Sequence, residues 1–408
     1  MSFTLGVVLF AFGIGVSVAL HEFGHLLTAK AFGMQATKYF IGFGPTLFSF
    51  RRGETQYGLK AIPAGGFVSI TGMTRTERVP DTDQHRAFWR YPAWKRTVVL
   101  SAGSITHFLL AILAVYGAAV TAGLPTSKAV VASVQPCVVP TAAADGTVRD
   151  CAPGDPAAPA AGLGLRAQDQ IVAVAGQPVG TYAELLTVLR SRPGETVELT
   201  YRRDGEERTG SVTVASVQRK PIQGSTERPG PDGFVTVGAI GVAPSFTEHF
   251  GPAAAVGETF RFTGSMFQAT GTAIANFPEK VPALFGALAG EERDPEGPIS
   301  VVGASRVGGQ AIEAGFVLLF VLLFAGFNIF IGVFNLFPLL PLDGGHIAVL
   351  WFERARSRIA RALGRRDPGP VDLSKLVPLT VLVIVLFGGI SVIAILADIV
   401  NPIANPFR

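Results

Sequence analysis

The chain has 408 residues, of which 49% are hydrophobic and 16% are charged, and its mean hydropathy is +0.41. An ordinary soluble protein carries about 25% charged residues, so this composition excludes a typical soluble domain and is that of a membrane protein. The net charge of +4 is small for the length. Because the Lys and Arg residues form no single basic face with interleaved aromatic residues, nucleic-acid binding is not indicated.

Four apolar stretches are each long enough to cross a membrane, at roughly residues 3–31, 98–122, 316–340 and 376–399. Each exceeds the ~20 residues that a helix needs to cross a hydrocarbon core of about 30 Å. The first stretch has no basic segment before it and no small-residue cleavage site after it, so we expect a retained helix rather than a signal peptide.

The basic residues between these stretches predict the orientation. Lys and Arg residues concentrate in residues 30–96 and 354–375, and the positive-inside rule places both loops in the cytoplasm. Both termini and the long segment 123–315 are then expected on the other side of the membrane.

The first stretch ends in an unusually polar sequence, His21-Glu22-Phe23-Gly24-His25. A charged group at the centre of a bilayer helix costs ~2.5–3.5 kcal/mol on insertion scales, and such a cost normally marks a functional site. Positions i and i+4 of a helix share a face, so His21 and His25 can bind one metal ion while Glu22 acts on water beside it. The pattern predicts hydrolysis inside the membrane. The alternative is a pair of core histidines, which would leave Glu22 as an unpaired intramembrane acid.

A catalytic zinc ion needs a third protein ligand and an open position for water. Asp343 fits, because it ends the third apolar stretch on the cytoplasmic side, where the two histidines also lie. Pro338 and Pro341 break the helix before it, and Gly344-Gly345 permits close backbone approach. Without the histidine motif, Asp343 would read as a helix-terminal acid at the membrane interface.

Three further polar residues stand in or beside apolar stretches. The amide of Asn335 can hold a carbonyl oxygen or the substrate backbone, with an interhelical hydrogen bond as the equal alternative. His107 can line the cavity or be a packed, hydrogen-bonded histidine. His346 is a weaker ligand candidate, and a place behind the ligands or at the interface suits it better.

The first cytoplasmic loop has the pattern of a β-hairpin. After Gly42-Phe43-Gly44, two β-leaning runs at residues 46–52 and 55–62 are separated by Gly53-Glu54. Residues 63–68, which contain Gly65 and Gly66, follow as a turn or re-entrant loop. The alternative is a plain surface hairpin.

The long segment after the second stretch contains a compact domain at about residues 128–217. Strands are expected at 129–134 and 170–174, a helix at 182–190, and a hairpin of 197–202 with 210–214 around Asp204-Gly205. Residues 247–277 read as one or two amphipathic helices, and residues 286–306 read as a Gly/Pro-rich loop.

Cys137 and Cys151 are the two cysteines of the chain, and both lie in one loop of this exported domain. Cysteines used only on the outer side predict an oxidising compartment and a disulfide that closes the loop. Two free thiols are the alternative.

Together these motifs resemble the site-2 protease family of intramembrane zinc metalloproteases, in the group that includes the regulator-of-sigma-E protease and its actinobacterial relatives. The resemblance covers nearly the whole chain: the His21–His25 motif, the Gly42-Phe43-Gly44 hairpin, the Asn335-x-x-Pro338 and Leu342-Asp343-Gly344-Gly345 sequences, and the four spans. Residues 157–163 and 169–179 are similar to the PDZ pattern of exported bacterial proteases. In the second span, Ser104 and His107 stand where the family often has proline and asparagine, and Pro341 lies one place later than in some members.

The resemblance implies that His21, His25 and Asp343 bind one zinc ion per chain and that Glu22 is the general base. It implies that the substrate is held by Asn335, Pro338 and the hairpin residues Gly42, Phe43, Gly44, Gly65 and Gly66. The implied setting is a bacterial inner membrane. The implied partners are the lipid bilayer and a single-pass membrane protein, either an anti-sigma factor already trimmed on its outer side or a leftover signal peptide.

We therefore expect an α-helical polytopic membrane protein with four transmembrane helices, a cytoplasmic-side β-hairpin and an inserted α+β PDZ-like domain. The expected segments are a first membrane half (1–123), the PDZ-like domain (124–220), amphipathic helices with a loop (221–312) and a second membrane half (313–408). The PDZ-like domain can bind peptide termini or exclude substrates with large outer domains. The rival functions are a non-catalytic membrane scaffold and a membrane metal-binding protein or transporter.

Overall fold

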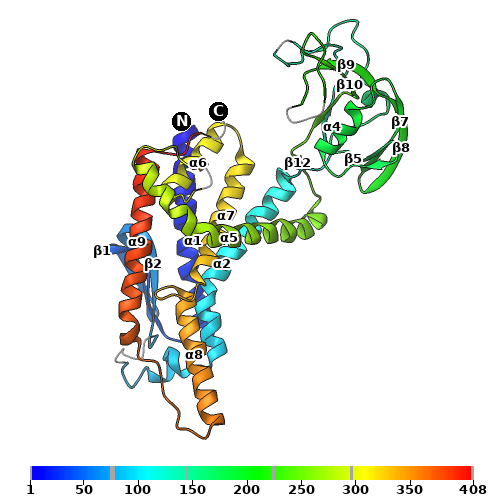
Figure 1. Ribbon diagram of the computed structural model, residues 1–408. Coiled ribbons are helices and arrows are strands. Elements are labelled where there is room, and N and C mark those ends of the chain that lie inside the picture. Colours follow the sequence, from blue (N-terminus) through cyan, green and yellow to red (C-terminus); the bar gives the residue numbers. More distant parts are fainter. Residues whose placement is uncertain (1, 74–78, 144, 223–226, 295–296, 406–408) are drawn as a thin grey trace. The chain divides into compact units, whose positions relative to one another are not determined.

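The computed structural model describes residues 2–73, 79–143, 145–222, 227–294 and 297–405, and the chain forms two compact units (Figure 1). Residues 1–118 and 256–408 make up one of them, called the membrane unit here, and residues 119–255 make up the other, the β-rich unit.

Four helices of the described chain are long and apolar enough to cross a membrane. They are α1 (Ser2–Ala31), α2 (Ala93–Thr121), α7 (Val317–Asn335) and α9 (Val377–Val400), the last preceded by the short 3-10 turn Leu373–Leu376. This confirms the predicted helical membrane architecture. Helix α7 ends five residues before the predicted end at 340, because Pro338 cannot donate to the helix and disfavours helical backbone before it.

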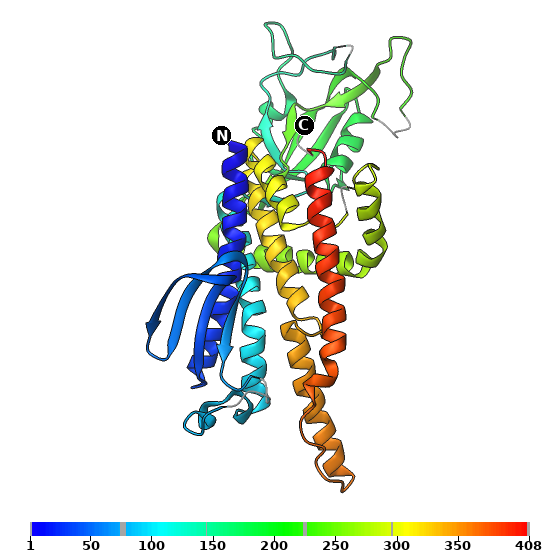
Figure 2. The ribbon, with the colours of Figure 1, turned by 90° about the vertical axis from the view of Figure 1, so that its left-hand side faces the viewer.

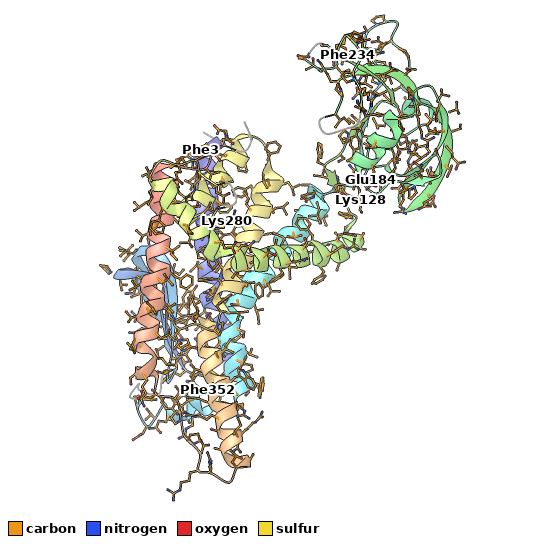
Figure 3. All side chains as sticks on the ribbon, in the orientation of Figure 1. Phe3, Lys128, Glu184, Phe234, Lys280 and Phe352 are labelled. Carbon is orange, nitrogen blue, oxygen red and sulfur yellow. A yellow bond between two sulfur atoms is a disulfide. The ribbon has the colours of Figure 1, made fainter. Side chains whose placement is uncertain are left out.

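A further helix, α6 (Val301–Glu313), packs along α1 in the membrane unit. A Cβ added to Gly6 would lie 2.8 Å from the Gly309 Cα, so the two backbones touch where neither residue has a side chain. Phe3, labelled in Figure 3, shares this contact, since a Cβ on Gly309 would lie 2.9 Å from its carbonyl oxygen. The predicted loop 286–306 therefore stops at Ser300, whose hydroxyl caps α6 by accepting the N–H groups of Val302 and Gly303. Gly308 and Gly309, which permit this packing, lie just after the segment that was predicted as a loop.

Helix α9 is held at one end by a buried ion pair. The Arg293 guanidinium donates to Asp398 Oδ1 at 2.7 Å, and the side chains are 4% and 2% exposed. The second carboxylate oxygen of Asp398 accepts the backbone N–H of Ser300 at 2.7 Å. An acid near a membrane span is costly unless it is partnered in this way.

The membrane unit also contains a β-sheet, formed by β1 (Ala36–Arg52) and β2 (Thr55–Ile70). Each long strand bends and pairs twice: residues 38–41 pair with both 56–59 and 66–69, and residues 46–52 pair with 55–60. The predicted hairpin is present, but residues 63–68 are not a turn or re-entrant loop, because residues 66–70 form the outer strand of this sheet. The left-handed backbone at Gly42 (φ +88°) and Gly44 (φ +81°) lets β1 bend. Figure 2 shows the sheet alongside α1.

The β-rich unit is built around a four-stranded antiparallel sheet in the order β6-β5-β7-β8. Its strands are β6 (Gln177–Pro178), β5 (Gln170–Val174), β7 (Thr196–Arg203) and β8 (Glu206–Thr213), and helix α4 (Tyr182–Arg190) covers one face. The alternating apolar residues of these strands and the Leu185–Leu189 face of α4 form its core. The predicted strand 170–174 and helix 182–190 have the predicted bounds.

This unit is longer than the predicted domain of residues 124–220. Strands β9 (Ala215–Arg219) and β10 (Val235–Ala239) pair with each other, β11 (Val242–Pro244) pairs with β4 (Val131–Val134), and β12 (Thr247–Glu248) pairs with β3 (Leu124–Pro125). Part of the segment expected to hold only helices and a loop is therefore strand. The amphipathic helix begins later and ends later than predicted, as the single helix α5 (Pro252–Leu288).

Cys137 and Cys151 are joined by a disulfide that closes a loop of the β-rich unit. Asp155 lies beside it and receives hydrogen bonds from the Arg149 guanidinium and the Ala152 N–H. These bonds lower the pKa of the Asp155 carboxyl to about 2, so the group stays ionised and keeps the loop in place at any physiological pH.

Replacing both cysteines by serine should lower the free energy of unfolding of the β-rich unit by about 3 kcal/mol, because the reduced chain regains the freedom of a closed loop of this size. Thermal unfolding of the full chain in detergent measures the loss. Mass spectrometry of a non-reduced digest provides the control, and two separately alkylated Cys peptides from fresh membranes would contradict the disulfide.

Candidate metal centre

The two histidines of the first span lie on one face of α1 and point to one place. His21 and His25 are 7% and 8% exposed, and their Nε2 atoms lie 3.1 Å apart. A spacing of four residues on a helix produces this alignment.

Asp343 completes the group from another part of the chain. Its Oδ2 lies 3.4 Å from Nε2 of both histidines, and the three ligand atoms all lie within 4.8 Å of one another. Asp343 does not end the third span, as predicted, but is the first residue of α8 (Asp343–Ala362), which follows a turn after α7. The amphipathic α8 was not predicted, since its many arginines read as a loop.

Two glycines bring the start of α8 against the preceding turn. A Cβ on Gly344 would collide with the backbone of Leu336, and one on Gly345 would lie 2.5 Å from the Leu340 nitrogen. The predicted close backbone approach at this pair is present, and it fixes the direction from which Asp343 reaches the histidines.

The spacing of the three ligand atoms suits a tetrahedral zinc ion. Zinc bonds of about 2.0–2.2 Å to nitrogen and oxygen place neighbouring ligand atoms about 3.3–3.6 Å apart, close to the separations seen here. Two histidines and one carboxylate are also a donor set of catalytic zinc sites, which leave a fourth position for water. The residues therefore fit zinc.

The protonation of His25 is set by its neighbour on α2. Its Nδ1 lies 2.7 Å from the carbonyl oxygen of Val99, which can only accept a hydrogen bond. Nδ1 therefore carries the proton, and Nε2 keeps the lone pair that a metal needs.

Helix α2 can approach α1 this closely because each helix has a glycine where it faces the other, Gly24 on α1 and Gly103 on α2. A Cβ on Gly24 would lie 2.6 Å from Thr106 Oγ1, and a Cβ on Gly103 would lie 2.5 Å from Nε2 of both His21 and His25. Sequence reasoning missed Gly103. A small residue four positions before a polar residue, His107, inside an apolar span was the available signal.

Glu22 and the three candidate ligands together line a cavity of about 140 Å³. The outer strand of the sheet forms another wall, and a Cβ on Gly66 would lie 2.8 Å from Glu22 Cγ. The Tyr39 hydroxyl ties the sheet to α1 by donating to the Ala19 carbonyl oxygen at 2.8 Å. The remaining lining residues are Phe67, Val68, Ile70, Met73, Val99 and Leu100.

The other predicted site residues lie outside this lining. Gly42 is packed against the sheet, where a Cβ would lie 2.7 Å from the Ile62 carbonyl oxygen, and Phe43 stacks on Phe67 with ring centres 6.3 Å apart. Gly44 and Gly65 belong to the same sheet. Asn335 is the last residue of α7, and Pro338 lies in the turn toward α8.

A second cavity of about 260 Å³ shares Met73 and Leu100 with the first. His346 lines this second cavity together with Arg96 and Glu353. The structure thus places His346 behind the ligand group rather than in it.

Gly103→Ala should weaken metal binding, because the new methyl group would occupy the space of the His21 and His25 rings. We expect a destabilisation of about 1–3 kcal/mol of the kind that overpacking causes, with the metal content of the purified protein falling below one ion per chain. Gly117→Ala on the same helix is the matched control, since nothing lies within 4 Å of its Cβ position. A Gly103→Ala protein with a full metal content would contradict this role.

Comparisons with known proteins agree with this geometry. Residues 9–365 match the model of Peptidase family M50. The chain is 41% identical over 410 residues to the zinc metalloprotease Rip1 of Mycobacterium bovis (strain BCG / Pasteur 1173P2), with 99% of both chains covered. It is 31% identical over 355 residues to a putative zinc metalloprotease of Brucella suis biovar 1, with 84% of each covered.

Among solved structures, the PDZ domain of an SdrC-like protein from Listeria monocytogenes matches 30% of this chain and 90% of that domain, at 16% identity and a TM-score of 0.18. The family match covers most of the chain and the Rip1 match covers nearly all of it. This multi-pass membrane protein therefore belongs to peptidase family M50 and is a zinc metalloprotease.

Proposed function

We propose that this protease cleaves a peptide bond within the transmembrane segment of a single-pass membrane protein. The observation that supports the proposal is the cavity beside α1, where the candidate zinc ligands, Glu22 and the outer strand border one space. A scaffold protein would have no use for an acid in such a position.

Glu22 is the proposed general base. Zinc held by His21, His25 and Asp343 would polarise a peptide carbonyl and lower the pKa of water at the site toward ~7. Glu22 then takes the proton of the attacking water and gives it to the leaving amine. The missing side chain at Gly66 lets the outer strand lie against the Glu22 side chain, since a Cβ there would lie 2.8 Å from Glu22 Cγ.

The outer strand, residues 66–70, is the proposed substrate platform. A transmembrane helix hides its carbonyl groups in i to i−4 hydrogen bonds, so the substrate must unwind before it can react. Within the described residues, this strand pairs on one side only, with residues 36–41. Its other side can hold an unwound segment by strand addition. Asn335, Pro338, Gly42, Phe43, Gly44 and Gly65 remain proposed contributors to substrate binding.

The second cavity is the proposed source of water. It shares the lining residues Met73 and Leu100 with the first cavity, and its charged lining residues Arg96 and Glu353 can keep it hydrated inside an otherwise apolar unit. With the basic loops in the cytoplasm, as the positive-inside rule suggests, water would enter from the cytoplasmic side.

The proposed setting is a bacterial inner membrane, with the termini and the PDZ-like domain outside the cytoplasm. The proposed substrates are a pre-trimmed anti-sigma factor or remnant signal peptides. These proposals rest on the charge distribution and on the motif resemblance described above.

Glu22→Gln should abolish cleavage without removing zinc, because an amide cannot take a proton from water but has nearly the same shape. We expect the rate on a single-pass model substrate to fall by about 10²- to 10⁴-fold, the usual contribution of a general base. Cleavage by the purified variant in detergent or liposomes measures the effect.

Glu313→Gln, at the exposed end of α6, is the matched control and should leave the rate unchanged. A Glu22→Gln rate near that of the unaltered chain would overturn the mechanism. Comparing membrane proteomes of cells with the active and Glu22→Gln proteins would identify the substrates, which should accumulate uncut in the variant.

Strand addition predicts that the substrate's main chain matters beside the scissile bond. A synthetic transmembrane substrate with N-methyl groups on two amides next to that bond should lose roughly 10-fold in kcat/KM, because two main-chain hydrogen bonds of ~0.5–1.5 kcal/mol are lost. The same two groups placed at the far end of the substrate serve as the control. Equal rates for both substrates would contradict the platform.

A further inference from the structure

The second nitrogen of the His21 ring is buried without a hydrogen-bond partner. Nε2 of His21 faces the ligand group, so a neutral metal-binding ring must carry its proton on Nδ1. Among the described residues, no group accepts a hydrogen bond from this Nδ1, although His21 is only 7% exposed. His25 differs, because its Nδ1 is paired with the Val99 carbonyl oxygen.

His107 lies beside the ring of His21. The His107 side chain comes from α2, one helical turn after Gly103, and the residue is 1% exposed. Its ring centre is 5.1 Å from that of His21, with the two planes inclined at 45°.

The proton of the His107 ring is placed by Asn328 on α7. The Asn328 Nδ2 donates to the Phe324 carbonyl oxygen at 2.9 Å, which turns its Oδ1 toward His107 Nδ1 at 2.8 Å. Because both the carbonyl oxygen and Oδ1 accept only, His107 Nδ1 must be the donor. Nε2 of His107 is then left with a lone pair.

We propose that His107 is a positioning residue for the zinc site, whose Nε2 accepts the Nδ1 proton of His21 across one water molecule or after a small turn of the ring. The bond completes a chain from the Phe324 carbonyl through Asn328 and His107 to His21. It fixes the tautomer of His21 and the direction of its Nε2, as the Val99 carbonyl does for His25. The inference rests on the metal-binding role of His21 given above.

Ser17 is the rival acceptor. It lies one helical turn before His21 on α1, is 1% exposed, and its hydroxyl also has no partner among the described residues. A hydrogen bond from His21 Nδ1 to the Ser17 hydroxyl would also fix the tautomer of His21, so the two residues must be tested side by side.

The test measures the zinc affinity and zinc release rate of the full chain in detergent, by competition with a chromophoric chelator. His107→Phe keeps the ring volume without a nitrogen and should weaken zinc binding about 10- to 100-fold, the usual effect of losing a partner behind a ligand. His107→Gln restores an acceptor and should recover most of the affinity. Ser17→Ala should bind zinc as the unaltered chain does. Unchanged affinity in His107→Phe, or a loss in Ser17→Ala as large as that expected for His107→Phe, would overturn the proposal.

Asn328→Leu provides a second variant that keeps His107 in place. Without Asn328 the His107 ring can take its other tautomer, so zinc affinity should fall, and combining the change with His107→Phe should add little further loss.

Unfolding in excess chelator separates these effects from misfolding, since a positioning role leaves the metal-free stability of His107→Gln unchanged. If His107→Phe does not fold, unchanged zinc affinity in Asn328→Leu overturns the proposal. His21→Ala tests the ligand role separately, since retained zinc in that variant would refute that role itself.

Discussion

The site depends on the close approach of α1 and α2, which two glycines permit. Gly24 and Gly103 remove the side chains that would keep the helices apart, so the Val99 carbonyl reaches one ligand ring and His107 lies beside the other. Lipid offers no hydrophobic force to press helices together, so contact in a membrane must come from shape and from hydrogen bonds. Here the same contact that packs the helices also orients the ligands.

The third candidate ligand, Asp343, is placed by the turn between α7 and α8. Asp343 reaches the histidines because α7 stops at Asn335 and α8 begins at Asp343, after a turn that Gly344 and Gly345 allow to be tight. The sheet then supplies the remaining wall of the cavity, tied to α1 by Tyr39. Residues of α1, α2, α8 and the sheet thus converge on a space of about 140 Å³.

The parts of this site that could be predicted are those with a local pattern. Two histidines at i and i+4 share a face of any helix, and a polar residue in an apolar stretch is conspicuous whatever surrounds it. Asp343 could be paired with them because charge bias put both segments at one depth. The four spans could likewise be predicted from the length of the apolar stretches, and the main strands of the β-rich unit from the alternation of apolar and polar residues.

What could not be predicted depends on contacts between distant segments. Helix α6 begins inside a segment with the composition of a loop, and its Gly308 and Gly309 lower its helical propensity while they permit contact with α1. Residues 63–68 look like a turn, and only pairing with residues 36–41 shows that residues 66–70 are a strand. The pairing of His107 with Asn328 joins residues 221 positions apart, and nothing local distinguishes it from an isolated buried histidine.

The ion pair between Arg293 and Asp398 has a consequence for how such a sequence can diverge. Losing one partner leaves the other charge buried and unmatched, at a cost of about 3–5 kcal/mol, whereas replacing both by apolar residues can be close to neutral. If the two residues are replaced one at a time, the chain with a single replacement therefore holds α9 poorly. In relatives of this chain, the two positions should change together or be inherited together, although 105 residues separate them in the sequence.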